Sequence, residues 1–244
     1  MDRAKVLKQI NTDYTQYMNT DSSIQQLYGR LQKGRVTQPD ALQFAKLGGS
    51  ELADAVIANM GEEIVLEDAL AIIPEALRTN YDYVTSYMTR LQTKLDQKAK
   101  IGLKPLTAPF DADRAAGLAE AATVSSPDLL KSQIMNFSMH TVDESMQMTA
   151  ESRNNAGLEV LVSRKYDDVG VHNRKDPCQW CIDRECDQIP YQEAYEMGVF
   201  ERHDGCECLI TYTNERGDTT YQSAKGAWYE STEEALEKRR NHGL

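Results

Sequence analysis

One stretch of the 244-residue sequence decides much of the fold: residues 70–95 read LAIIPEALRTNYDYVTSYMTRLQTKL. Its apolar residues recur at intervals of three or four, the spacing of one face of an α-helix. They are Leu70, Ile73, Leu77, Tyr81, Val84, Met88, Leu91 and Leu95. The pattern predicts a long helix over about residues 67–98. Because Pro74 lies inside the pattern, the helix is expected to kink at this residue or to begin close to it.

Helical patterns continue on both sides of this stretch, over residues 1–152. Two segments with helical spacing precede it, and Gly34 ends the second of them. A third segment, residues 39–60, is expected to break at Gly48-Gly49, after which Ser50 can cap a new helix. Further along the chain, residues 101–110 predict a loop and Asp111 the start of a short helix.

A central helix is predicted over about residues 127–150. Ser126-Pro127-Asp128 is a typical helix start, with a serine cap and a proline in the first turn. The apolar residues that follow form two stripes, so this helix should contact several neighbours. His140 lies on it and is interpreted as a structural histidine.

The pattern changes after Gly157, where alternating apolar residues predict a strand. A short helix is expected over 190–198, then a second strand with Cys206, Cys208, Ile210 and Tyr212 on one face. Beyond it, residues 214–222 predict a hairpin, and Ser231 with Glu234 a capped terminal helix. The expected fold is therefore α+β: a mainly α-helical domain, residues 1–152, followed by a small α+β Cys/His module, residues 157–244.

All five cysteines of the chain fall within this module, between residues 178 and 208. The segments C-Q-W-C and H-D-G-C-E-C have the spacing of zinc-binding knuckles, and Zn²⁺ takes four nitrogen or sulfur ligands in a tetrahedron. Cys178 and Cys181 are the firmest ligands; two of His203, Cys206 and Cys208 would complete the site. Cys186 is the weakest candidate. Trp180 and Phe200 are expected to wall the site.

A structural role for the zinc is favoured, because a module of fewer than 90 residues with few large apolar side chains has a thin core. Packed or redox-active thiols and a catalytic metal are the alternatives. Pro177-Cys178-Gln-Trp-Cys181 matches half of the zinc deaminase signature, but the required H-x-E is missing, since His140 is followed by Thr-Val and His172 by Asn-Arg. A Cys–His nucleophilic pair is also available. The helical first two-thirds of the sequence contains nothing that resembles a catalytic motif, such as a Gly-rich phosphate loop, G-x-S-x-G or H-E-x-x-H.

Composition narrows the classes of partner. The net charge is −11, which disfavours broad binding to a phosphate backbone. No apolar run approaches the roughly 20 residues needed to span a membrane, and the N-terminus does not read as a signal peptide. Clustered cysteines without a secretion signal indicate a reducing compartment. Acidic helix positions such as Glu75 and Asp96 are expected at the surface, available to a protein partner.

The C-terminal residues resemble the phage Mu-type minor head, or head morphogenesis, proteins of tailed bacteriophages. The likeness is carried by C-Q-W-C at 178–181 and by V-F-E-R-H-D-G-C-E-C-L-I at 199–210. It covers about residues 157–222 in detail, whereas the preceding region is similar only in its helical layout. Many members have a basic residue where this chain has Glu207.

The resemblance implies a low-copy, usually non-enzymatic virion protein, made in the host cytoplasm and located in the head interior or near the portal. The implied partners are portal, scaffold or major capsid protein, with homo-oligomerisation and incidental contact with packaged DNA as further options. Two alternatives stay open: a small zinc-dependent effector enzyme, nuclease or toxin-like, and a zinc-stapled nucleic-acid-binding module.

Overall fold

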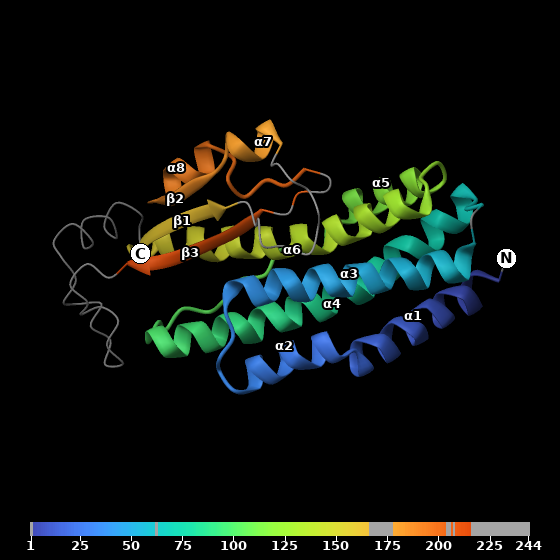
Figure 1. Cartoon of the computed structure of the whole chain (residues 1–244), viewed down its shortest axis with the longest axis horizontal. Coiled ribbons are helices and arrows are strands. Elements are labelled where there is room, and N and C mark those ends of the chain that lie inside the picture. The colour runs from blue at the N-terminus through green and yellow to red at the C-terminus, as the bar shows by residue number, and fades with distance from the viewer. Residues whose placement is uncertain (1, 62, 166–177, 204–205, 207, 216–244) are drawn as a thin grey trace.

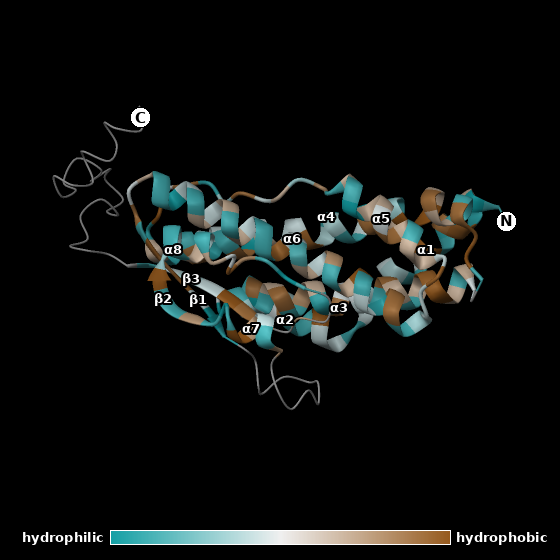
Figure 2. Cartoon of the chain, turned by 90° about the horizontal axis from the view of Figure 1, so that it is seen from above, coloured by the Kyte–Doolittle hydropathy of each residue, from teal (hydrophilic) through white to brown (hydrophobic). Residues whose placement is uncertain are grey.

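The computed structural model describes residues 2–61, 63–165, 178–203, 206 and 208–215. Its first part is a bundle of long helices, shown from blue to yellow-green in Figure 1. The helices are α1 (Arg3–Thr20), α2 (Ser22–Gln32), α3 (Gln38–Met60), α4 (Leu66–Ala99), α5 (Ala112–Ala122) and α6 (Pro127–Asn155). Hydrophobic and hydrophilic residues alternate along them (Figure 2), as expected for helices that bury one side.

Side-chain caps fix where several of these helices begin. Asp21 accepts hydrogen bonds from Ser23 N and Ile24 N at the start of α2, and Asp111 accepts one from Arg114 N at the start of α5. Ser126 caps α6 through Leu129 N, and Pro127 occupies the first turn. The predicted starts of α5 and α6 are therefore confirmed.

Helix α4 confirms the long helix predicted over about residues 67–98. It runs from Leu66 to Ala99 without a break at Pro74, which lies two turns inside it. The missing N–H of a proline removes one helical hydrogen bond there. Leu70, the first residue of the predicted stripe, is largely exposed, whereas the residues from Ile73 onward face the core.

Helix α3 corrects the expected break at Gly48-Gly49, because it is continuous across both glycines. A Cβ atom on Gly49 would lie 2.8 Å from Met135 Cα and 2.8 Å from Ser138 Oγ of α6. The glycine therefore serves the close approach of two helices rather than a turn.

The second part is a small three-stranded antiparallel sheet with short helices. Its strands are β1 (Glu159–Lys165), β2 (Cys186–Pro190) and β3 (Leu209–Glu215), in the order β2-β1-β3. Helices α7 (Gln179–Ile182) and α8 (Tyr191–Glu196) lie between β1 and β3 in the chain. The α+β architecture expected from the sequence is thus confirmed. The hairpin and terminal helix predicted beyond residue 215 lie outside the described residues.

The sheet packs on the helices through one continuous core. Inward-facing residues of the strands, such as Val162 and Tyr212, are buried in the same hydrophobic cluster as the bundle interior. Figure 1 shows β1 and β3 lying along α6. Tyr212 is further held from α3, since its main-chain N–H donates to Gln38 Oε1 (2.9 Å) and its carbonyl accepts from Gln38 Nε2 (3.0 Å).

Asp96 is buried, contrary to the expectation from its helix position. Only 4% of the residue is exposed, and its Oδ1 accepts hydrogen bonds from Arg153 Nη2 (2.6 Å) and Gln92 Nε2 (2.9 Å). Arg153 Nη1 also donates to the Tyr212 hydroxyl, which in turn donates to Gln92 Oε1 (2.9 Å). The cause is the docked sheet, which covers this side of α4 and α6.

Among the described residues, none of the helices combines the length and the apolarity that a membrane crossing requires.

Candidate metal centre

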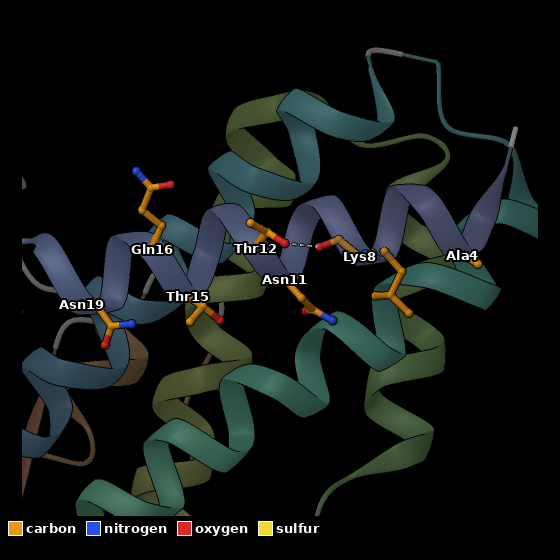
Figure 3. Close-up of a pocket in the computed structure, with 8 residues that line it drawn as sticks. Ala4, Lys8, Asn11, Thr12, Thr15, Gln16 and Asn19 are labelled. Carbon is orange, nitrogen blue, oxygen red and sulfur yellow. Dashed lines mark hydrogen bonds between the residues drawn. The ribbon is translucent and has the colours of Figure 1, made fainter.

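Two features of the described residues are compared as candidate sites. The first is an open groove along α1, lined by Leu7 and by small and polar residues of this helix (Figure 3). Lys8 is its one ionisable lining residue, and its main-chain carbonyl accepts a hydrogen bond from Thr12 Oγ1 (2.8 Å). Such a lining brings together no cluster of ionisable or metal-ligating side chains. The second feature is the cysteine-rich cluster of the small module.

The cluster is assembled by two turns that face each other. Cys178 caps the short helix α7, and Cys181 lies within it; Cys181 N donates to Cys178 O (2.9 Å). The opposite turn precedes β3, where Cys206 N donates to His203 O (3.1 Å). We call the resulting cluster the Cys/His centre; it consists of Cys178, Cys181, His203, Cys206 and Cys208.

The ligand atoms of the Cys/His centre lie close together. Cys178 Sγ is 3.6 Å from Cys181 Sγ and 3.2 Å from His203 Nε2. Cys181 Sγ is 3.0 Å from His203 Nε2 and 3.9 Å from Cys206 Sγ. A tetrahedral site with metal–sulfur bonds of about 2.3 Å has ligand atoms about 3.8 Å apart. The observed spacing is therefore close to that of a bound tetrahedral metal.

Two overlapping triads make up the centre, and Cys181 belongs to both. The first triad adds Cys178 and His203, the second Cys206 and Cys208, and within each triad the ligand atoms lie within 4.8 Å of one another. All five predicted ligands are thus brought to one place and can hold a metal ion. Cys186 lies apart on β2, with its Sγ 3.8 Å from Val162 O.

Trp180 and the sulfurs form a small apolar cluster of their own. Cys181, Cys206 and Cys208 are buried, whereas Cys178 is exposed. The Trp180 ring meets His203 edge-on, with ring centroids 5.0 Å apart. Phe200, the other expected wall residue, is buried in the main core, where its ring lies 6.1 Å from that of Tyr191.

Two buried arginines beside the centre were not predicted from the sequence. Arg164 of β1 donates through Nη1 to the carbonyls of Val199 and Glu201 (both 2.6 Å) and through Nη2 to Cys206 Sγ (3.3 Å). Arg202 donates to the carbonyls of Cys206 (2.8 Å) and Cys208 (3.1 Å). Together they hold the segment that carries three of the five candidate ligands. Only Arg164 could have been noticed in the sequence, because it is a cation at a position of the alternating strand that is expected to face inward.

Arg202 also forms a buried ion pair with Asp143 of α6. Its Nε and Nη2 donate to the two carboxylate oxygens at 2.6 and 3.2 Å, and both side chains are 1% exposed. Burial raises the pKa of Asp143, and Arg202 opposes this increase. The pair connects the Cys/His centre directly to the helical bundle.

The cysteines differ in their readiness to lose a proton. Hydrogen bonding from Cys208 lowers the pKa of Cys206 to about 4, and the charges of Arg202 and Arg164 contribute to the decrease. Burial raises the pKa of Cys181 to about 11. The hydrogen bond from the Cys181 main chain lowers the pKa of Cys178. The centre therefore favours at least one thiolate, which is the form that binds a metal.

His140 is placed outside the Cys/His centre, on α6. Its Nε2 lies 3.7 Å from Glu144 Oε2, one turn further along the helix, and burial lowers the pKa of its imidazole. This environment agrees with its interpretation as a structural residue.

Comparisons of the chain with protein-family models, with curated proteins and with solved structures found no match. The resemblance to phage head proteins therefore stays a prediction.

Proposed function

We propose that this protein is a structural minor head protein of a tailed bacteriophage or prophage. In this proposal the Cys/His centre holds one Zn²⁺ that fixes the small module, and the helical bundle binds portal, scaffold or major capsid protein. The protein is non-enzymatic and acts during head morphogenesis. It is made in the host cytoplasm and becomes part of the virion.

The structural role of the zinc is supported by the burial of three of the five candidate ligands. Cys181, Cys206 and Cys208 are 4%, 1% and 1% exposed. Catalytic zinc sites keep an open position for water or substrate, whereas structural sites are closed by protein ligands. The Cys/His centre forms a small cluster apart from the main core, so a bound metal would supply folding free energy at this place.

Protein partners are favoured by the charge of the chain. With a net charge of −11, the surface is suited to a partner with basic or apolar faces and poorly suited to a nucleic-acid backbone. Glu75 of α4 is exposed and can contribute to such an interface without being needed for folding.

Elemental analysis of protein purified without added metal tests the zinc site. We expect close to one zinc per chain, lost on Cys181→Ser substitution and retained on Cys186→Ser substitution. Cys186 is the matched control because it lies outside the Cys/His centre. A wild-type chain free of zinc, with all thiols reactive, would refute the proposed metal site.

Particle association tests the role in the head. Deletion of the gene from its phage should give defective or poorly infectious particles, while DNA replication is unaffected. The wild-type protein should copurify with heads or head precursors, and Glu75→Lys should weaken this association without loss of folded protein. Intact, infectious particles from the deletion would overturn the proposal.

A zinc-dependent effector enzyme is the second candidate, and the exposure of Cys178 favours it. An exposed ligand that leaves the metal would open a coordination position. Turnover of a nucleic-acid or other defined substrate by the zinc-loaded wild-type chain, abolished in Cys181→Ser with the fold retained, would establish this alternative.

A further inference from the structure

We infer that four of the five residues of the Cys/His centre bind the metal and that Cys208 stays outside the ligand set. The four ligands are Cys178, Cys181, His203 and Cys206. We further propose that Arg164 is the counter-ion of this site, a positioning residue that balances its charge. Both statements rest on the metal site proposed above and go beyond it by assigning its members.

The distances between ligand atoms place Cys178, Cys181 and His203 in one triangle and make both Cys206 and Cys208 neighbours of Cys181. A tetrahedron has six edges, and four of them are present between the proposed ligands at 3.0–3.9 Å. Cys178 closes a triangle with Cys181 and His203, and Cys206 adjoins Cys181. Cys208 adjoins Cys181 in the same triad as Cys206, so the choice between Cys206 and Cys208 rests on their spacing in the sequence and on the contact of Arg164 with the Cys206 sulfur.

The spacing in the sequence favours Cys206. Cys178 and Cys181 are separated by two residues, as are His203 and Cys206. Zinc knuckles have two to four residues between their paired ligands. Cys206 and Cys208 are separated by one residue, so they are a poorer pair.

The buried charges beside the Cys/His centre indicate how many thiolates bind the metal. Arg202 is already neutralised by Asp143. Among the described residues, Arg164 contacts two carbonyls, the Cys206 sulfur and the Trp180 ring, whose centroid lies 4.9 Å from its Cζ, and none of these carries a carboxylate. Arg164 is fully buried, and a buried charge without a counter-charge is costly.

Three thiolates and a neutral histidine around Zn²⁺ carry a net charge of −1, which balances Arg164. Two thiolates would leave the arginine without a counter-charge, and four would leave one negative charge in excess. The proposed set of three cysteines and one histidine is therefore the one that neutralises the described residues of this interior.

Cobalt substitution tests the ligand set. Co²⁺ replaces Zn²⁺ in tetrahedral sites, and the intensity of its near-ultraviolet sulfur-to-metal band grows with the number of bound thiolates. We expect Cys208→Ala to keep one metal per chain and the wild-type intensity. The matched variant Cys178→Ala should lose about a third of the intensity, as one of three thiolates is removed.

The opposite result, in which Cys208→Ala loses intensity and Cys178→Ala does not, would overturn the assignment while leaving the zinc site intact. Four thiolates, seen as a loss in both variants, would overturn it as well. A wild-type chain that binds no metal would instead refute the proposed function and this inference together.

Two substitutions at Arg164 test the counter-ion. Arg164→Gln removes the charge but keeps hydrogen-bond donors, whereas Arg164→Lys keeps the charge but cannot span the same carbonyls. Substitution of residues that contact metal ligands commonly weakens metal binding by about 10–100-fold. We expect a loss of this size in Arg164→Gln and an affinity closer to wild type in Arg164→Lys, by competition with a chromophoric chelator.

The control is Arg153→Gln, which removes an equally buried guanidinium that pairs with Asp96 away from the centre. It should lower stability and leave the metal affinity of the folded protein unchanged. Equal losses of affinity in Arg164→Gln and Arg164→Lys, or wild-type affinity in Arg164→Gln, would show that Arg164 acts only through its backbone contacts. Should Arg164→Gln fail to fold, a large loss of metal affinity in folded Arg164→Lys would by itself overturn the counter-ion role, and a near wild-type affinity would support it.

Discussion

At the scale of single residues, Gly48 and Gly49 show how one residue type can have two meanings. Gly48 lies beside a buried polar chain in which Asn80 Nδ2 donates to the Tyr14 hydroxyl (2.7 Å) and Ser138 Oγ donates to Asn80 Oδ1 (2.7 Å). This chain connects α1, α4 and α6, and the two glycines let α3 lie against it. In the sequence a glycine pair predicts a helix break, but in this structure it permits close packing of α3 against its neighbouring helices.

The contact at Gly49 leads to a first prediction. Gly49→Ala should destabilise the protein by about 1–3 kcal/mol, because the new methyl group meets the α6 backbone and close packing resists overfilling. The midpoint of urea unfolding measures this change. Gly29→Ala in α2 is the control: its Cβ would meet no atom within 4 Å, and we expect it to be stabilising by about 0.5–1 kcal/mol. A neutral Gly49→Ala would show that α3 and α6 can separate at low cost.

A second residue prediction follows from the burial of Asp96. Replacing it with alanine leaves Arg153 buried without its carboxylate partner, and breaking a buried ion pair in this way costs about 3–5 kcal/mol. The loss should appear as a lower free energy of unfolding in urea. Glu75→Ala, on the exposed side of the same helix, should change that free energy by less than about 0.5 kcal/mol. Equal effects of the two substitutions would contradict the buried pair.

At the scale of elements, α6 is the helix that joins the two parts of the molecule. It packs along α3, and it supplies Asp143 and Arg153 to the ion pairs that hold the loop before β3 and the side chain of Tyr212. Its two predicted apolar stripes are explained by this double contact. The bundle and the small sheet are thus connected by charges as well as by apolar packing.

The buried ion pair between Asp143 of α6 and Arg202 of the small module gives a third prediction. Asp143→Ala should lower the free energy of unfolding by about 3–5 kcal/mol, because Arg202 then remains buried and unpaired. The double variant Asp143→Leu, Arg202→Met should recover part of the loss, and a double-mutant cycle measures the coupling.

The control is the exposed pair between Asp54 and Lys131, whose side chains are 50% and 35% exposed. Asp54→Ala should change the free energy of unfolding by no more than about 1 kcal/mol. The free-energy change of the double variant could instead equal the sum of the changes in the two single variants at Asp143 and Arg202. The two residues would then not act as a pair.

At the scale of the whole molecule, one core carries both the bundle and the sheet, whereas the Cys/His centre forms a separate small cluster. Removing a metal from this cluster should therefore loosen residues 178–208 and leave the helices folded. Limited proteolysis with and without a strong chelator tests this fourth prediction. New cleavage sites are expected within 178–208, and none within α3 or α6.

Trp180 offers an independent readout of the same event, since its ring contacts His203 and lies under Arg164 and Arg184. In a Trp228→Phe background its emission should shift on chelation and return on addition of Zn²⁺. Unchanged emission and unchanged proteolysis would mean that the centre folds without metal.

The sequence by itself determined the local features of this protein. Helical spacing predicted α4 and α6, caps predicted where α5 and α6 begin, and alternation predicted β1, because each depends on residues a few positions apart. The five candidate ligands were likewise identified by spacing within two short segments.

Only the tertiary structure decided which residues are brought together across long separations. The burial of Asp96, the packing role of Gly49, the contact of Arg164 with Cys206 and the pairing of Arg202 with Asp143 all depend on partners more than 35 residues away. No local pattern encodes such contacts, since the same charge or glycine is equally compatible with a solvated surface or a turn. The docking of the small module on α6 turns the charges into buried pairs, and the packing of α3 against α6 gives Gly49 its close approach.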